Sequence, residues 1–273
     1  MKRALCIGIS RFADPNTSPL AGGANDASLL STMLQEHFDF KTSEVRSLTD
    51  ESATTSAIVA GLEWLTAGAA PGDVLVFTLA THGTRTIDHN APQGPAGEVG
   101  GNERIFLAYD SSVSNNLLRD DVAAILDRVP EGANCYCIID TCDIGPFYYA
   151  KRLDVYEEDR RAVHSDRNVH ISKNDNLHRR NSSTERDDAM SRVEFTSCAA
   201  REQSFDLPDA TPPQGLFTHS LYKALEQSSW DMTVSEVYEE VKSRVIALAD
   251  SMRKKQTPQL RAPQHLMNNK IFR

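Results

Sequence analysis

The segment that decides the fold is Val74-Leu-Val-Phe-Thr-Leu-Ala-Thr-His-Gly83, an apolar run that ends in a threonine, a histidine and a glycine. An apolar run of this kind, with no polar alternation, is typical of a strand buried on both faces of a parallel sheet. Other strand candidates lie at residues 4–9, 45–48, 105–109, 135–139 and 193–197.

Helical patterns alternate with these runs. In the stretch after Gly22, Leu29, Leu30, Met33 and Leu34 recur at the spacing of one helix face. Strands that alternate with helices predict an α/β fold, with a mostly parallel central sheet flanked by helices, in a single domain. Further helices are predicted at residues 56–67, 120–126, 217–227 and 234–252.

Composition excludes several classes of protein. The 273 residues include 29 Lys and Arg against 38 Asp and Glu, a net charge of −9, and five cysteines. The acidic balance argues against a nucleic acid partner, because binding phosphates requires a concentrated basic face. No window approaches the roughly 20 apolar residues of a membrane span, and the apolar stretch after Arg3 is too short for a secretory signal. With an odd number of cysteines and no metal-binding spacing, we expect reduced thiols, a cytoplasmic location and no membrane partner.

A long polar segment interrupts the pattern. Residues 164–188 contain only three sizeable hydrophobic side chains. Such a segment buries too little apolar area to offset its ordering entropy. We therefore expect residues 146–191 to form a mobile linker between a larger portion, residues 1–145, and a smaller portion, residues 192–273.

Two reactive side chains directly follow predicted central strands. His82 follows the run that begins at Val74, and Cys142 follows the run that begins at Cys135. The carboxyl ends of parallel strands meet at one edge of a sheet, so the imidazole and the thiol face each other if these strands are neighbours. An imidazole can take the proton of a cysteine nucleophile. The backbone N–H groups of Gly83 and Cys142 are our candidates for stabilising the resulting oxyanion.

Six segments occur in an order that matches a known family. They are Ala4-Leu-Cys-Ile-Gly-Ile9, Leu20-Ala-Gly-Gly-Ala-Asn-Asp26, His82-Gly83, Asp140-Thr-Cys-Asp-Ile-Gly145, Phe195-Thr-Ser-Cys-Ala199 with Glu202 and Ser204, and Gly215-Leu-Phe-Thr218. With these segments the chain resembles the caspase and metacaspase cysteine peptidases of clan CD. It is similar to a short, prokaryotic-type metacaspase, for which we expect no prodomain. The separation of His82 and Cys142, sixty residues, is near the roughly 50 residues typical of caspases.

The resemblance implies a catalytic dyad and a substrate pocket. His82 and Cys142 would be the dyad of an endopeptidase. Asp26 and Asp140 match the acidic pocket of metacaspases, which accepts an Arg or Lys side chain, and we predict cleavage after Arg, with Lys as the second candidate. Asp26 could instead cap the helix that follows it.

The resemblance also suggests a calcium site at Glu103, Asp120 and Asp121, since Ca²⁺ binds several oxygen ligands. Tyr149 stands where a further acidic ligand would be expected. Asp120 could instead cap the short helix at residues 120–126. The chemistry of the dyad itself requires no cofactor.

The predicted linker carries three pairs of basic residues, which end at Arg152, Arg161 and Arg180. A protease specific for basic residues could cut after them. Self-cleavage, or cleavage by an upstream activating protease, would then free the active-site loops. The alternative is a tolerated surface insertion with ordinary solvated charge.

Two functions follow from these observations. One is a cysteine endopeptidase that cleaves protein or peptide substrates after basic residues, used as a cell-death or defence effector as the family is. The other is a catalytically silent, caspase-like interaction or regulatory module. The presence of both His82 and Cys142 favours the enzyme, because a chain that has lost the activity need not keep either residue.

Overall fold

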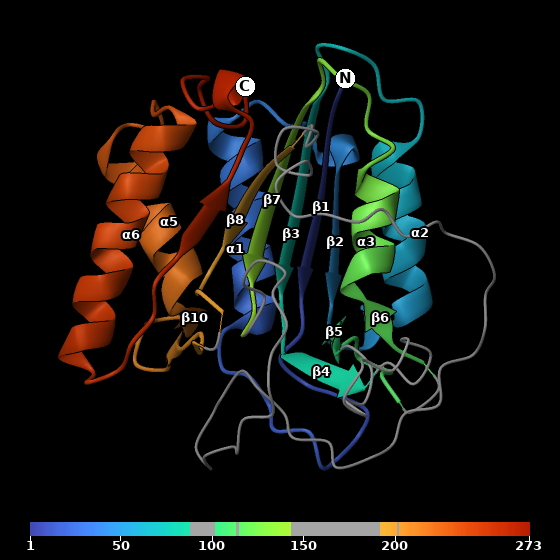
Figure 1. Ribbon diagram of the computed structural model, residues 1–273, viewed down its shortest axis with the longest axis vertical. Helices are drawn as coiled ribbons and strands as arrows, with labels where there is room; N and C mark the ends of the chain where they lie inside the picture. Colours follow the sequence, from blue (N-terminus) through green and yellow to red (C-terminus); the bar gives the residue numbers. More distant parts are fainter. Residues whose placement is uncertain (88–101, 113–114, 143–191, 201) are drawn as a thin grey trace, which may run out of the picture.

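The computed structural model describes residues 1–87, 102–112, 115–142, 192–200 and 202–273. Its main sheet consists of β1 (Lys2–Gly8), β2 (Val45–Thr49), β3 (Val74–Ala80), β7 (Asn134–Asp140), β8 (Arg192–Thr196) and β11 (Gln259–Arg261). The strands lie in the order β11-β8-β7-β3-β1-β2 (Figure 1). All neighbouring pairs are parallel except β11 with β8.

The central strands are buried because apolar side chains occupy both of their faces. Every residue of β3 is buried, and so is β7 after its first residue. Helices therefore cover both sides of the sheet. This arrangement confirms the prediction of a mostly parallel sheet flanked by helices. One side carries α1 (Gly23–His37), α5 (Leu216–Gln227) and α6 (Val234–Ser251), and the other carries α2 (Thr55–Thr66) and α3 (Arg119–Leu126) (Figure 1).

The strand predicted at residues 105–109 begins and ends earlier in the chain. It is β5 (Asn102–Phe106), which pairs antiparallel with β4 (Gly83–Ile87) and β6 (Leu117–Leu118) in a separate small sheet. The apolar residues after Phe106 pack without joining a sheet ladder. The N–H of Leu107 instead donates to the carbonyl of His82, at 2.9 Å. A second short ribbon, β9 (Asp206–Leu207) with β10 (Gln214–Gly215), has no apolar run and was not predicted.

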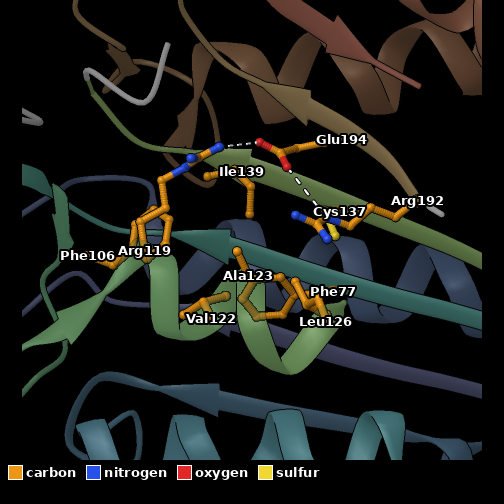
Figure 2. Close-up of a pocket in the computed structure, with 10 residues that line it drawn as sticks. All are labelled: Phe77, Phe106, Arg119, Val122, Ala123, Leu126, Cys137, Ile139, Arg192 and Glu194. Atoms are coloured by element: carbon orange, nitrogen blue, oxygen red, sulfur yellow. Dashed lines mark hydrogen bonds and ion pairs between the residues drawn. The ribbon is translucent and has the colours of Figure 1, made fainter. Parts of the chain in front are cut away.

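A buried charge cluster interrupts the apolar packing between α3 and β8. Arg119 of α3 donates to Glu194 of β8 at 2.8 Å, and Arg192 lies 3.6 Å from the same carboxylate and also pairs with Asp127. Figure 2 shows Arg119, Arg192 and Glu194 among the side chains that line a cavity of about 20 Å³. Burial alone would raise the pKa of Glu194. The facing guanidinium groups of Arg119, Arg192 and Arg261 outweigh that effect and hold the pKa below its ordinary value.

Among the helices that the structure describes, none is both long and apolar enough to span a bilayer.

Candidate active site

The two reactive side chains follow neighbouring strands. β3 pairs directly with β7, and Ala80 lies opposite Asp140 in the register. His82 and Cys142 each come two residues beyond this pair. The N–H of Thr81 donates to the carbonyl of Asp140 at 3.3 Å, so the two chains stay together past the ends of the strands. The structure thus brings His82 and Cys142 to one edge of the sheet, the lower edge in Figure 1.

The backbone at Gly83 approaches the backbone of Cys142 closely. A Cβ atom at Gly83 would lie 2.4 Å from the carbonyl oxygen of Cys142, a contact that no side chain can tolerate. The two backbone segments proposed as oxyanion donors are therefore in direct contact. Only glycine permits this approach without a shift of one of the two backbones.

The imidazole of His82 is fully buried and is oriented by its surroundings. Its Nε2 atom lies 2.8 Å from the carbonyl oxygen of Ser18, and the ring of Phe12 stacks on it with centroids 5.2 Å apart. A carbonyl can only accept a hydrogen bond, so in neutral His82 the proton is assigned to Nε2. Nδ1 is then the nitrogen that accepts a proton.

The sulfur of Cys142 is buried against Ser204, which follows β8. The N–H of Ser204 donates to Sγ at 3.2 Å, and Sγ lies 3.6 Å from the carbonyl oxygen of Ser204. Only 1% of Cys142 is exposed. In the sequence, Ser204 appears only as one residue of a segment that matches the family, and no local sequence pattern predicts its contact with the Cys142 thiol.

Asp26 does not cap its own helix. The N-cap of α1 is Gly22, without a side-chain cap hydrogen bond, and Asp26 lies in the first turn. Its two carboxylate oxygens instead accept hydrogen bonds from the N–H of Gly215, at 2.9 and 3.1 Å. The capping interpretation is wrong because the carboxylate turns toward a segment that lies far along the chain.

Asp140 reaches the same segment. Its carboxylate accepts hydrogen bonds from the hydroxyl of Ser204 at 2.7 Å, and from the hydroxyl and the N–H of Thr218 at 2.9 and 3.3 Å. Gly215 and Thr218 are the N-cap residue and a first-turn residue of α5. The two predicted pocket carboxylates therefore both lie at the N-terminus of α5, where the helix dipole favours negative charge.

The three residues suggested for calcium are only partly described by the structure. Asp120 and Asp121 are exposed on the first turn of α3, and only the backbone of Glu103, on β5, is described. Partial desolvation, and then the neighbouring Asp120, raise the pKa of Asp121. Within the described residues, no three His, Cys, Asp or Glu side chains are grouped to hold a metal ion. Calcium binds six to eight oxygen ligands, and the side chain of Glu103 lies outside the described part of the chain, so a calcium site at these residues stays a prediction.

The capping alternative for Asp120 is also wrong. The helix begins one residue earlier than predicted, its N-cap is Leu118, and that position makes no side-chain cap hydrogen bond. Asp120 lies in the first turn of the helix, where the positive end of the helix dipole stabilises its negative charge.

The predicted linker lies outside the described residues, and so do Tyr149 and the proposed processing sites Arg152, Arg161 and Arg180.

Gln256 is the residue of this region that sequence reasoning missed. It is 1% exposed, it lies between α6 and β11, and it hydrogen-bonds to Ser204 and Phe205. Nothing in its neighbourhood of polar and basic residues signals burial. Only contacts between distant segments reveal it.

Comparison with known sequences identifies related proteins. The family model of the caspase domain matches residues 1–267. Metacaspase-1 of Cryptococcus neoformans var. neoformans serotype D is 31% identical over 161 residues, which cover 55% of this chain and 34% of that protein. Metacaspase-2 of Arabidopsis thaliana is 33% identical over 152 residues, which cover 53% of this chain and 34% of that protein. The chain thus spans about a third of the length of these curated relatives.

Comparison with solved structures supports the same fold. A protein from Geobacter sulfurreducens superimposes with a TM-score of 0.67 at 15% identity, covering 99% of this chain and 98% of that protein. Caspase-1 from Spodoptera frugiperda superimposes with a TM-score of 0.59 at 15% identity, covering 95% of this chain and 85% of that protein. At such low identity these similarities establish the fold alone.

Proposed function

Because the chain belongs to the caspase domain family, we propose that it is a cysteine endopeptidase with Cys142 as the nucleophile and His82 as the general base. His82 takes the thiol proton, and the sulfur attacks the carbonyl carbon of the scissile peptide bond. The N–H groups of Gly83 and Cys142 stabilise the oxyanion. His82 then gives its proton to the leaving amine, and water hydrolyses the thioester that remains.

The observation that carries this proposal is the direct pairing of β3 with β7, with Ala80 opposite Asp140. Parallel pairing in this register puts the residues two positions further on at the same edge of the sheet. The close approach of Gly83 to the Cys142 carbonyl supports the same arrangement, because it ties together the two backbone segments that would hold the oxyanion. The carbonyl of Ser18, 2.8 Å from Nε2, supplies the orienting group that a catalytic histidine needs.

The substrate class that we propose is a protein or peptide with Arg at the cleavage position, or less readily Lys. Asp26 and Asp140 support this preference because the hydrogen bonds from Gly215 and Thr218 bring two carboxylates to one place, beside the segment that follows β3 and β7. A guanidinium group that enters beside a carboxylate can form two parallel hydrogen bonds with it, whereas an ammonium group acts as a point charge.

The proposal extends to processing. If the enzyme cleaves after Arg, then Arg152, Arg161 and Arg180 are candidate sites for its own activity or for an upstream protease. Their replacement by Ala, singly and together, should change the pattern of fragments on a gel and the onset of activity. An unchanged gel and unchanged activity would show that the segment is a tolerated insertion.

The experiment that tests the proposed activity is hydrolysis of fluorogenic peptides that end in Arg, Lys or Asp. We expect turnover of the Arg peptide, slower turnover of the Lys peptide and none of the Asp peptide. The Cys142→Ala variant should lose at least about 10³-fold in kcat/KM, because the nucleophile is missing.

Cys6→Ala is the matched control. Cys6 is fully buried in β1, and burial raises the pKa of its thiol to about 12, so it stays protonated at neutral pH. Its removal should leave turnover unchanged. Equal signals from wild type and Cys142→Ala would favour the silent interaction module, and turnover of the Asp peptide would overturn the pocket assignment.

A further inference from the structure

A buried glutamine holds the loop that contacts the nucleophile. Gln256 lies between α6 and β11 and is 1% exposed. Its Oε1 accepts a hydrogen bond from the N–H of Phe205 at 3.0 Å. Its Nε2 donates to the hydroxyl of Ser204 at 3.1 Å and to the carbonyl of Ser197 at 3.0 Å. The side-chain amide of Gln256 therefore makes three hydrogen bonds to the loop after β8. One is to Ser204 itself, and the other two are to Ser197 and Phe205, which lie before and after it.

Ser204 in turn contacts both parts of the proposed active site. Its N–H donates to Sγ of Cys142 at 3.2 Å, and its hydroxyl donates to the carboxylate of Asp140 at 2.7 Å. The hydroxyl has one proton, which goes to Asp140, so the hydrogen bond from Gln256 uses its lone pair. The direction of each hydrogen bond in this chain is thereby set.

We infer that Gln256 is a positioning residue that holds the N–H of Ser204 as a hydrogen-bond donor to the sulfur of Cys142. The inference rests on the proposed function in one respect, that Cys142 is the nucleophile. A hydrogen bond from an N–H group stabilises a thiolate more than a thiol, because the charged acceptor binds the donor more strongly. Gln256 would therefore favour the reactive form of Cys142 without touching it or the substrate.

The geometry around the sulfur contains two opposing contacts. The thiol form can donate to the carbonyl of Ser204, but that contact is long, at 3.6 Å. The N–H contact is shorter, at 3.2 Å, and it is retained when the proton leaves. The described titratable groups on the segments around the sulfur are His82, two residues beyond β3, Asp140 on β7, whose carboxylate accepts from the Ser204 hydroxyl, and Cys198 after β8, whose Sγ lies 3.5 Å from the carbonyl of Thr141.

The test measures the reactivity of the Cys142 thiol directly. The rate of alkylation by iodoacetamide, read by mass spectrometry at the peptide that carries Cys142, is followed against pH in the full-length protein. In Gln256→Ala the midpoint of this profile should rise by about one pH unit, which is the effect of one hydrogen bond to a charged group. Gln256→Met should also raise it, because the thioether has a similar length and no charge but cannot donate to Ser204.

Gln264→Ala is the matched control, because Gln264 is exposed, and its midpoint should equal that of wild type. A merely structural role for Gln256 would lower the rate at every pH and leave the midpoint in place. An unchanged midpoint in folded Gln256→Met would therefore overturn the inference.

A measurement on the unmodified residue covers the case in which Gln256→Ala does not fold. The amide proton resonance of Ser204 in wild type should titrate with the alkylation midpoint, and this titration should vanish in Cys142→Ala. A Ser204 amide proton resonance that does not change with pH as the Cys142 thiol ionises would refute the inference. These measurements need no peptide substrate. If the protein cleaves no peptide but the alkylation midpoint still shifts in the Gln256 variants, the proposed function is contradicted and the effect of Gln256 on the Cys142 thiol still holds.

Discussion

At residue 83 a single backbone contact dictates the amino acid. The ideal Cβ position lies 2.4 Å from the carbonyl oxygen of Cys142, and that oxygen belongs to a backbone held by β7. An added methyl group would therefore force one of the two backbones to shift. The same glycine is proposed to supply an oxyanion donor, so packing and chemistry require it for related reasons.

Gly83→Ala should lower kcat/KM for the Arg peptide by about 10²-fold or more, because the N–H groups of the oxyanion site move away from each other. Gly68→Ala is the control. Gly68 has a φ of +67° and open space around it, so alanine there costs about 1 kcal/mol in backbone strain without touching the site. Kinetics and thermal unfolding should show both variants destabilised and only Gly83→Ala impaired; equal activities would contradict the oxyanion assignment.

Between elements, the ion pair of Arg119 with Glu194 connects α3 to β8 inside the molecule (Figure 2). Its charges are removed from water, so the carboxylate is stable as an anion only because guanidinium groups face it. An exposed pair of the same chemistry and the same 2.8 Å distance joins Arg128 to Glu63. The two pairs have the same distance but differ in burial, and Glu194 also faces a second guanidinium group, that of Arg192.

Glu194→Gln should reduce the free energy of unfolding at pH 7 by about 3 kcal/mol, because two buried guanidinium groups lose their counter-charge. Glu63→Gln should cost less than about 1 kcal/mol, since solvent screens that pair. Urea denaturation of both variants measures the difference. Equal losses would show that the cluster in Figure 2 is as well solvated as the surface.

The pH dependence of this pair has a definite sign. The pKa of Glu194 is lower in the folded protein than its ordinary value. Its contribution to stability is therefore present above the ordinary value and is lost as the pH falls through the folded pKa. Wild type should lose more stability than Glu194→Gln on acidification from pH 7 to about pH 3, as measured by urea midpoints. Parallel losses would contradict the depressed pKa.

Across the whole molecule, residues before and after the undescribed segment 143–191 build one structure. β7 pairs with β8 over Cys135 to Ile139, and one apolar cluster combines side chains of α1 with those of α5 and α6. Asp26 and Gly215, 189 positions apart, share two hydrogen bonds. The two portions are therefore held together by pairing and burial independently of the chain that connects them.

A single cut within residues 146–191 should leave the two portions associated. We expect a protein cleaved at a site-specific protease sequence placed at Arg161 to elute at the volume of the uncut protein in size-exclusion chromatography. In denaturant the fragments should separate. Separate elution without denaturant would show that the shared cluster and the β7–β8 pairing are too weak to hold the small portion.

Several elements could be predicted because their signals are local. The apolar run at Val74 and the one at Cys135 indicate buried strands wherever they occur, and the helical spacing in 234–252 closely matches α6. The β9–β10 ribbon and β11 carry few apolar residues. These strands form because segments elsewhere in the chain pair with them by hydrogen bonds, and no local sequence pattern indicates such pairing.

The sequence by itself determined the fold class and the placement of His82 and Cys142 directly after buried strands. Hydrophobic runs, and the succession of strands and helices along the chain, depend only on residues that are close together in the sequence. Only the tertiary structure decided that β3 pairs with β7, that Asp26 turns to Gly215, and that Gln256 holds Ser204 against the thiol. Each of these contacts joins residues more than fifty positions apart. Their energies depend on which surfaces the folded chain brings together, and many pairings of distant polar groups are equally compatible with the linear order.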